Sequence, residues 1–126
     1  VPVGGLMVGK NYDEAADRLR EALPTEHVKF MESLQTSHIH GKYFLCHAGV
    51  RPGIPLDRQS EEDLLWIRDE LLSSKLNFGK IVVHGHTPVE APDVRPNRIN
   101  IDTGAFATGR LTCVVLDENG HRFLAV

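Results

Sequence analysis

The stretch KIVVHGHTPVE, Lys80–Glu90, places two histidines around a glycine directly after a short apolar run. The run Ile81–Val83 has no alternation of apolar and polar residues, which indicates a strand covered on both faces. A glycine after a strand lets the backbone turn sharply and lets a ligand come close. The sequence therefore predicts a buried strand with His84 and His86 at its carboxyl end. These histidines could bind a metal or only the backbone.

Two other segments repeat this arrangement of a strand followed by a polar residue and a glycine. His47 follows an apolar run in FLCHAGVRPG, and Asp102 ends the run in INIDTGA. Ligands bind at the carboxyl ends of strands in open α/β sheets, and imidazole is a common metal ligand. If their strands are neighbours, His47 and His86 are expected to share one cation. Their ring nitrogens would then lie roughly 3–4 Å apart, each about 2.1 Å from the metal.

The rest of the chain predicts an α/β or α+β fold, with helices stacked on a sheet. Apolar spacing, caps and turn residues define the expected elements. These are helices over 11–23, 25–34 (capped by Thr25) and 60–74 (with a Ser60–Asp63 capping box), hairpins near Gly41 and at Asn119-Gly120, and a loop over 88–97.

Composition bounds the class of protein. The chain has 126 residues, which predicts one domain, and 41% of them are hydrophobic. A formal net charge of -3 gives no reason to expect binding to nucleic acid or to a membrane surface. Cys46 and Cys113 both lie in apolar runs, so we expect two free, packed thiols and a cytoplasmic protein.

Four segments resemble the C-terminal half of calcineurin-like metallophosphoesterases, closest to the bacterial serine/threonine protein phosphatase branch. They are YFLCHAGVRPG, DLLWIRDE, VVHGHTP and INIDTGA, within residues 24–116. The resemblance implies part of a four-layer β-sandwich flanked by helices, with two divalent cations (Mn, Fe or Zn) in the complete enzyme. The family's GD-x-H, GD-x-x-D-R-G and GNHE segments do not occur in the sequence. Residues 1–126 are therefore expected to be the C-terminal half of one domain, with VPVGG following the GNHE segment.

The same resemblance implies roles for individual residues. His47 and His86 resemble ligands of one of the two metals, and Arg68 resembles the arginine that contacts the substrate phosphate. His84 is a further candidate for a contact with substrate or with a metal ligand. The family's catalytic histidine has no counterpart here, so no catalytic residue is assigned. Two imidazoles would hold no cation or one cation weakly, and the chain alone is expected to be inactive.

The leading functional hypothesis is a phosphatase of phosphorylated serine or threonine in proteins. The alternative is a hydrolase of dinucleoside polyphosphates of the diadenosine tetraphosphate type, because related hydrolases share the HAG and GHT segments. A third hypothesis is a non-catalytic remnant that acts as an interaction module. Strands missing from the sheet would leave an uncovered surface, which predicts self-association.

Several residues near these segments are expected to be structural. Arg51 is a weaker phosphate candidate and is expected to be a solvated loop charge. Asp102 is expected to cap its own turn, and Trp66 to pack in the interior. Four other histidines are expected on the surface or in turns: His27, His38, His40 and His121.

Overall fold

The computed structural model describes residues 12–126, so the VPVGG segment lies outside the described residues. The chain forms two compact units, which divide between Gln35 and Thr36. The first unit contains helices α1 (Tyr12–Ala22) and α2 (Thr25–Glu32). The predicted cap at Thr25 is wrong: Pro24 occupies the cap position, and Thr25 is already the first helical residue.

The second unit contains a five-stranded sheet and a separate two-stranded sheet. The larger sheet has the order β1 (Ser37–His40), β2 (Tyr43–Cys46), β3 (Ile81–His84), β5 (Arg98–Asn100), β4 (Asp93–Val94), and the smaller sheet pairs β6 (Thr112–Asp117) with β7 (Gly120–Ala125). Strands β2, β3 and β5 are parallel, whereas β1 and β4 pair antiparallel at the two edges. The structure confirms both predicted hairpins. Residues 88–97 are not wholly loop, because β4 forms there.

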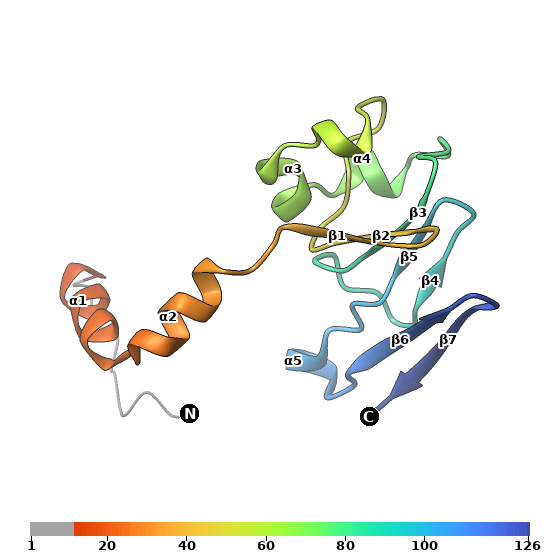
Figure 1. Cartoon of the computed structure of the whole chain (residues 1–126). Helices are drawn as coiled ribbons and strands as arrows, with labels where there is room; N and C mark the ends of the chain where they lie inside the picture. The colour runs from red at the N-terminus through yellow and green to blue at the C-terminus, as the bar shows by residue number, and fades with distance from the viewer. Residues whose placement is uncertain (1–11) are drawn as a thin grey trace. The chain divides into compact units, whose positions relative to one another are not determined.

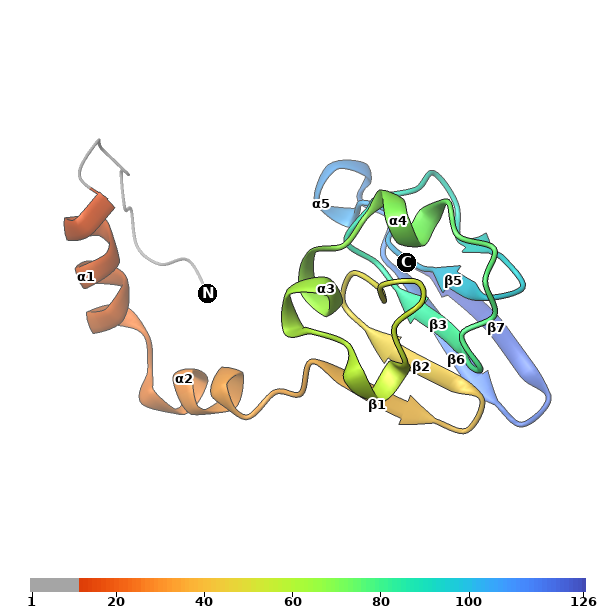
Figure 2. The ribbon, with the colours of Figure 1, turned by 90° about the horizontal axis from the view of Figure 1, so that it is seen from above.

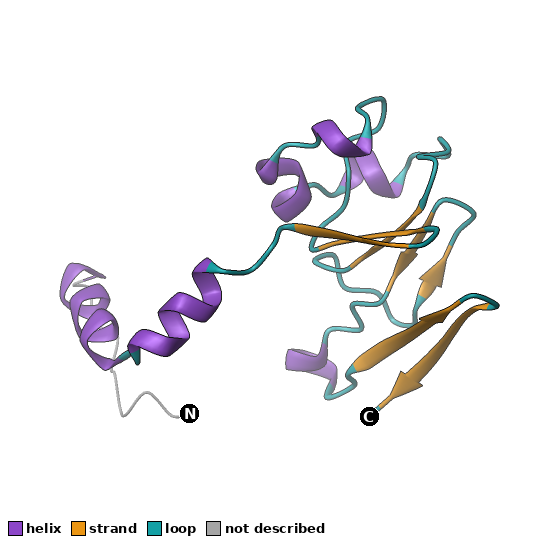
Figure 3. Ribbon diagram, in the orientation of Figure 1, coloured by secondary structure: helices purple, strands orange, loops and turns teal. Residues whose placement is uncertain are grey.

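Layers cover both faces of the larger sheet (Figures 1 and 3), so its central strands β2, β3 and β5 are largely buried. On one face, Phe44 and Val82 pack against residues from helices α3 (Glu61–Trp66) and α4 (Asp69–Leu72) and from the loop after β2. On the other face, Val83 and Ile99 pack against the β6–β7 hairpin. Figure 2 shows α3 and α4 lying over the sheet. The second unit is therefore a mixed α/β structure of helices, sheet and second sheet, as predicted.

The helix predicted over residues 60–74 is broken. Helix α3 ends at Trp66 and α4 begins at Asp69, with Ile67 extended (ψ 145°) and Arg68 in a non-helical conformation (φ -132°, ψ -94°). The break keeps Ile67 in the core while it turns Arg68 away from the helical path. The start of α3 is as predicted: the Ser60 hydroxyl accepts a hydrogen bond from the Asp63 amide at 3.1 Å.

Smaller elements and one thiol also differ from expectation. A 3-10 helix (Leu56–Arg58) and the short helix α5 (Ala105–Thr108) lie in segments for which no helix was predicted. Cys113 is exposed, so only Cys46 fits the prediction of packed thiols. Burial raises the pKa of Cys46 to about 12, which makes this thiol a poor nucleophile. Among residues 12–126, no helix is both long and apolar enough to span a bilayer.

Candidate metal and phosphate site

The site is built where the parallel strands β2, β3 and β5 end. Because these strands are neighbours and run the same way, the residues after them meet along the edge of the sheet that is formed by the carboxyl ends of the strands. Backbone bonds extend the pairing past the strands: the Gly85 amide donates to the His47 carbonyl at 2.8 Å, and the Ile101 amide donates to the His84 carbonyl at 2.9 Å. The predicted gathering of strand ends is therefore confirmed.

His47 and His86 lie against each other at this edge. The distance from His47 Nε2 to His86 Nδ1 is 3.1 Å, within the range predicted for two ligands of one cation. His86 has a positive φ of 67°, which is uncommon for a residue with a side chain. Such conformations persist where the surrounding structure holds them, and they cluster at functional sites.

The environment of His86 favours its neutral form. Burial of the ring, together with the charges of Arg68 and His47, holds the pKa of His86 below its ordinary value. A neutral imidazole is the form that binds metals. The His86 Nε2 atom is buried and has no hydrogen-bond partner within the described chain.

The two histidines fit part of a metal site. They offer two imidazole nitrogens at a suitable separation. No group of three or more histidine, cysteine or acidic side chains that could hold a metal occurs among residues 12–126. A complete site needs further ligands, normally with carboxylates to offset the charge of the cation. The ligand roles of His47 and His86 remain predictions.

Arg68 borders the same site. Its Nη1 atom donates to the His86 carbonyl and to the Thr87 hydroxyl, each at 3.1 Å. The side chain is exposed, and within residues 12–126 no bond is recorded from its Nε or Nη2 atoms. One nitrogen therefore fixes the guanidinium beside His86, while the other two are available to a planar or tetrahedral anion.

His84 is buried, unlike the exposed side chains of His47 and Arg68. It is 2% exposed, and burial lowers its pKa to about 4, so it is neutral at ordinary pH. Its Nδ1 atom lies 3.2 Å from the Gly85 carbonyl, and its Nε2 atom is buried without a partner in the described part of the chain. A direct contact with substrate would require His84 to become accessible.

The sequence did not single out Asn100, which holds the two loops of the site together. This side chain is fully buried at the end of β5. Its Nδ2 atom donates to the Thr87 carbonyl at 2.8 Å, and its Oδ1 atom accepts from the Asp102 amide at 3.0 Å. The available signal was a polar residue between two isoleucines, Ile99 and Ile101.

Asp102 acts as predicted within its own turn. Its Oδ1 atom accepts a hydrogen bond from the Gly104 amide at 2.9 Å. The Asp102 side chain also lies close to Gly85: a Cβ atom at residue 85 would be 3.2 Å from the Asp102 Cβ atom. Gly85 therefore lets the loop that carries His86 pack tightly against the end of β5.

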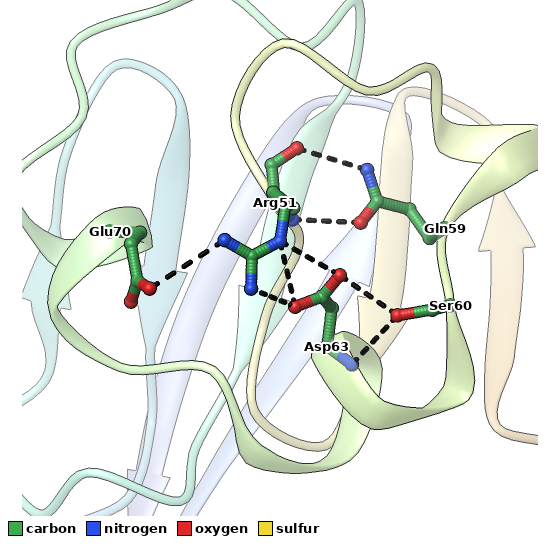
Figure 4. Close-up of polar contacts among 5 residues, drawn as sticks. All are labelled: Arg51, Gln59, Ser60, Asp63 and Glu70. Atoms are coloured by element: carbon green, nitrogen blue, oxygen red, sulfur yellow. Dashed lines mark hydrogen bonds and ion pairs between the residues drawn. The ribbon is translucent and has the colours of Figure 1, made fainter.

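Arg51 is an exposed loop residue, as predicted, but its charge is also paired with two carboxylates (Figure 4). Its Nε atom donates to both carboxylate oxygens of Asp63, at 2.9 and 3.0 Å, and its Nη1 atom lies 3.6 Å from Glu70 Oε1. Gln59 bonds to the Arg51 backbone. Because Asp63 is in α3 and Glu70 is in α4, Arg51 fixes the loop after His47 to both helices that flank Arg68. This engagement leaves it a poor phosphate ligand.

Trp66 also differs from expectation. It was predicted to pack in the interior, but it is 68% exposed at the last position of α3. Its indole ring stands almost perpendicular to the His86 ring, with centroids 5.7 Å apart and an interplanar angle of 88°. The break after Trp66 allows Ile67 to enter the core while the indole stays at the candidate site.

Comparisons with known proteins support the predicted fold. No family model matches the chain. A crystal structure assigned provisionally as a diadenosine tetraphosphatase matches with a TM-score of 0.69 and 21% identity, over 90% of this chain and 60% of that chain. The chain thus has a fold of the metallophosphatase type.

A second comparison finds a similar curated protein. The chain is 24% identical, over 123 residues, to the asymmetrical bis(5'-nucleosyl)-tetraphosphatase PrpE of Anoxybacillus flavithermus. That match covers 85% of this chain but 50% of the relative, so the chain spans about half the length of the relative. Both matched proteins are named as tetraphosphatases of dinucleotides, and neither match supports the serine/threonine phosphatase branch.

Proposed function

We propose that this chain is part of a metal-dependent hydrolase that cleaves dinucleoside polyphosphates. The observation that carries the proposal is the cluster of His47, His86 and Arg68 at one edge of the sheet. Two imidazole nitrogens lie 3.1 Å apart, and an arginine with free donors is fixed beside them. This combination suits a cation and a phosphate group held side by side.

Each residue has a distinct task in this proposal. His47 and His86 hold a divalent cation, such as manganese or zinc, with ligands from elsewhere in the complete protein. When bound, a divalent cation supplies charge neutralisation and Lewis acidity at a phosphoryl group. Arg68 orients the phosphate through Nε and Nη2, and its positive charge favours the charge that develops during phosphoryl transfer. Asn100 and Arg51 hold the loops after the strands in position.

The substrate class is proposed on the strength of the matched relatives. Both are named for the hydrolysis of dinucleoside tetraphosphates, which supports the alternative hypothesis from the sequence over a protein phosphatase. The segments shared with protein phosphatases support metal-dependent phosphoester chemistry in general, and they do not favour one substrate class. A protein substrate has no support beyond those segments.

The test is hydrolysis of diadenosine tetraphosphate with manganese or zinc titrated in, by this chain and by the product of the complete reading frame. Asymmetrical cleavage would give ATP and AMP, whereas symmetrical cleavage would give two ADP, and ion-exchange chromatography separates the outcomes. A phosphoserine peptide serves as the competing substrate. We expect the complete product to cleave the dinucleotide in a metal-dependent way and this chain to be inactive. Preferential hydrolysis of the peptide would overturn the proposal.

We further propose that the chain self-associates. Within the second unit, β1 is an edge strand with Ile39 exposed, and Leu124 of β7 is also exposed. Exposed edges and apolar side chains favour pairing with another chain. Size-exclusion chromatography across a range of concentrations should show a species larger than a monomer, and a monomer at every concentration would contradict this.

A further inference from the structure

Trp66 has a surface free for a ligand beside the candidate site. It is 68% exposed, and its contact with His86 is edge to face, which leaves indole surface open to solvent. Exposure alone proves nothing, because single exposed apolar residues are normal on protein surfaces. The informative observation is the position: the indole touches the ring of a predicted metal ligand, two residues before Arg68.

We propose that Trp66 is the stacking surface for a nucleobase of the substrate, and that it makes the site prefer nucleoside polyphosphates to phosphates without a base. This inference rests on the proposed function, because it assumes that the phosphate chain binds at Arg68 and the histidines. A flat aromatic ring stacks any base, since every base has a π-face. The phosphate chain of the substrate would then bind at the anion site, while its base stacks on the neighbouring indole ring.

The chemistry of the neighbouring groups favours a nucleotide over a purely apolar ligand. Arg68 provides an exposed guanidinium, which suits a phosphate, whereas the indole suits an uncharged ring. A protein segment or a second copy of the chain covering Trp66 would bury the indole without any need for the adjacent anion site. That occupancy is the competing outcome of the test.

The sequence contains one tryptophan, so tryptophan emission, excited where the two tyrosines do not absorb, reports on this site alone. The chain is titrated with diadenosine tetraphosphate and, separately, with inorganic tripolyphosphate, both with manganese present. Stacking should quench the emission of Trp66 with the dinucleotide, and tripolyphosphate should quench it much less. Absence of quenching by millimolar dinucleotide would overturn the proposal.

Variants separate stacking from other roles of Trp66. Trp66→Leu keeps apolar bulk without an aromatic face, and Trp66→Phe keeps a smaller face. By calorimetry, Trp66→Leu should weaken dinucleotide binding roughly 5- to 150-fold, and Trp66→Phe by less, while tripolyphosphate binding stays unchanged. Equal losses for both ligands would show that Trp66 only positions His86, and unchanged dinucleotide binding would exclude any contact. A change of oligomeric state in Trp66→Leu without a change in binding would show that protein covers the indole.

Arg68→Ala distinguishes failure of this inference from failure of the proposed function. If that change leaves the binding of both ligands unaltered, the phosphate site is wrong, whatever Trp66 does. If it weakens both ligands while Trp66→Leu weakens neither, the phosphate site stands and the stacking inference fails. We expect Arg68→Ala to weaken the binding of both ligands. We expect Trp66→Leu to weaken the binding of the dinucleotide alone.

Discussion

The Leu71 side chain fills the space that any side chain at Gly49 would need. A Cβ atom built at residue 49 would lie 2.1 Å from the Leu71 Cδ2 atom, and Leu71 is fully buried. Gly49 also has a φ of 150°, which residues with side chains rarely adopt. The glycine after His47 is therefore required by the packing of α4 on the sheet, independently of any ligand.

Gly49→Ala should lower the free energy of unfolding by about 3 kcal/mol, from overpacking and backbone strain together. The matched control is Gly53→Ala, where φ is also positive (85°) but nothing lies within 4 Å of the added Cβ atom. Gly53→Ala should lower the free energy of unfolding by about 1 kcal/mol, from backbone strain alone. Urea unfolding measures both, and equal costs would show that α4 can move to accept the methyl group.

Replacement of either histidine should weaken metal binding. His47→Ala and His86→Ala should each reduce the affinity for manganese or zinc by roughly tenfold or more, because each removes one ligand of a shared cation. The double variant should lose little beyond the larger single effect, since residues that act as a unit are not additive. Calorimetric titration of the metal measures this. His38→Ala, on the exposed part of β1, is the control and should bind as the parent does.

Arg68 should matter for the anion more than for the metal. Arg68→Ala should weaken tripolyphosphate binding about tenfold, the value of one charge-assisted contact at an exposed site. Metal affinity should change less, because Nη1 touches only the backbone of His86 and the Thr87 hydroxyl. Arg58→Ala removes an exposed charge elsewhere and serves as the comparison. A uniform loss of metal and anion binding would mean that Arg68 merely supports the loop.

The backbone of His86 offers a test of stored strain. His86→Ala and His86→Gly remove the same imidazole, but only glycine relaxes at a φ of 67°. The glycine variant should therefore be about 1 kcal/mol more stable than the alanine variant, by thermal or urea unfolding. Equal stability would indicate that the loop relaxes once the ring is gone.

The Arg51–Asp63 pair predicts how stability depends on pH. Hydrogen bonds from Arg51 hold the pKa of Asp63 below its ordinary value. A carboxyl with a lowered pKa stabilises the folded state fully above its unfolded value of about 4, and that stabilisation disappears as the pH falls through the lower folded value. Asp63→Asn should therefore melt at a lower temperature than the parent at pH 7, and the difference should narrow in acid. A difference independent of pH would assign the effect to packing.

The sequence predicts the strand ends well, because an apolar run followed by a histidine and a glycine is a local pattern. It could not predict the break after Trp66, since LLWIRDELL contains no glycine or proline. The acidic pair Asp69 and Glu70, typical of a helix start, is a weak sign of it. The role of Arg51 could not be predicted for a different reason: Asp63 and Glu70, the carboxylates that pair with its side chain, lie 12 or more residues away and reach it only when both helices are packed.

The parallel pairing of β2 with β3 also sets when the site appears during folding. Its register joins Tyr43 to Ile81 across a long intervening segment, whereas the β1–β2 and β6–β7 hairpins join close neighbours. Hairpins form in roughly 1–10 μs, but distant pairing must first overcome the entropy of closing a long loop. A partly folded chain that contains only its hairpins holds His47 and His86 apart. The 3.1 Å approach of the two histidines therefore marks completion of the central sheet.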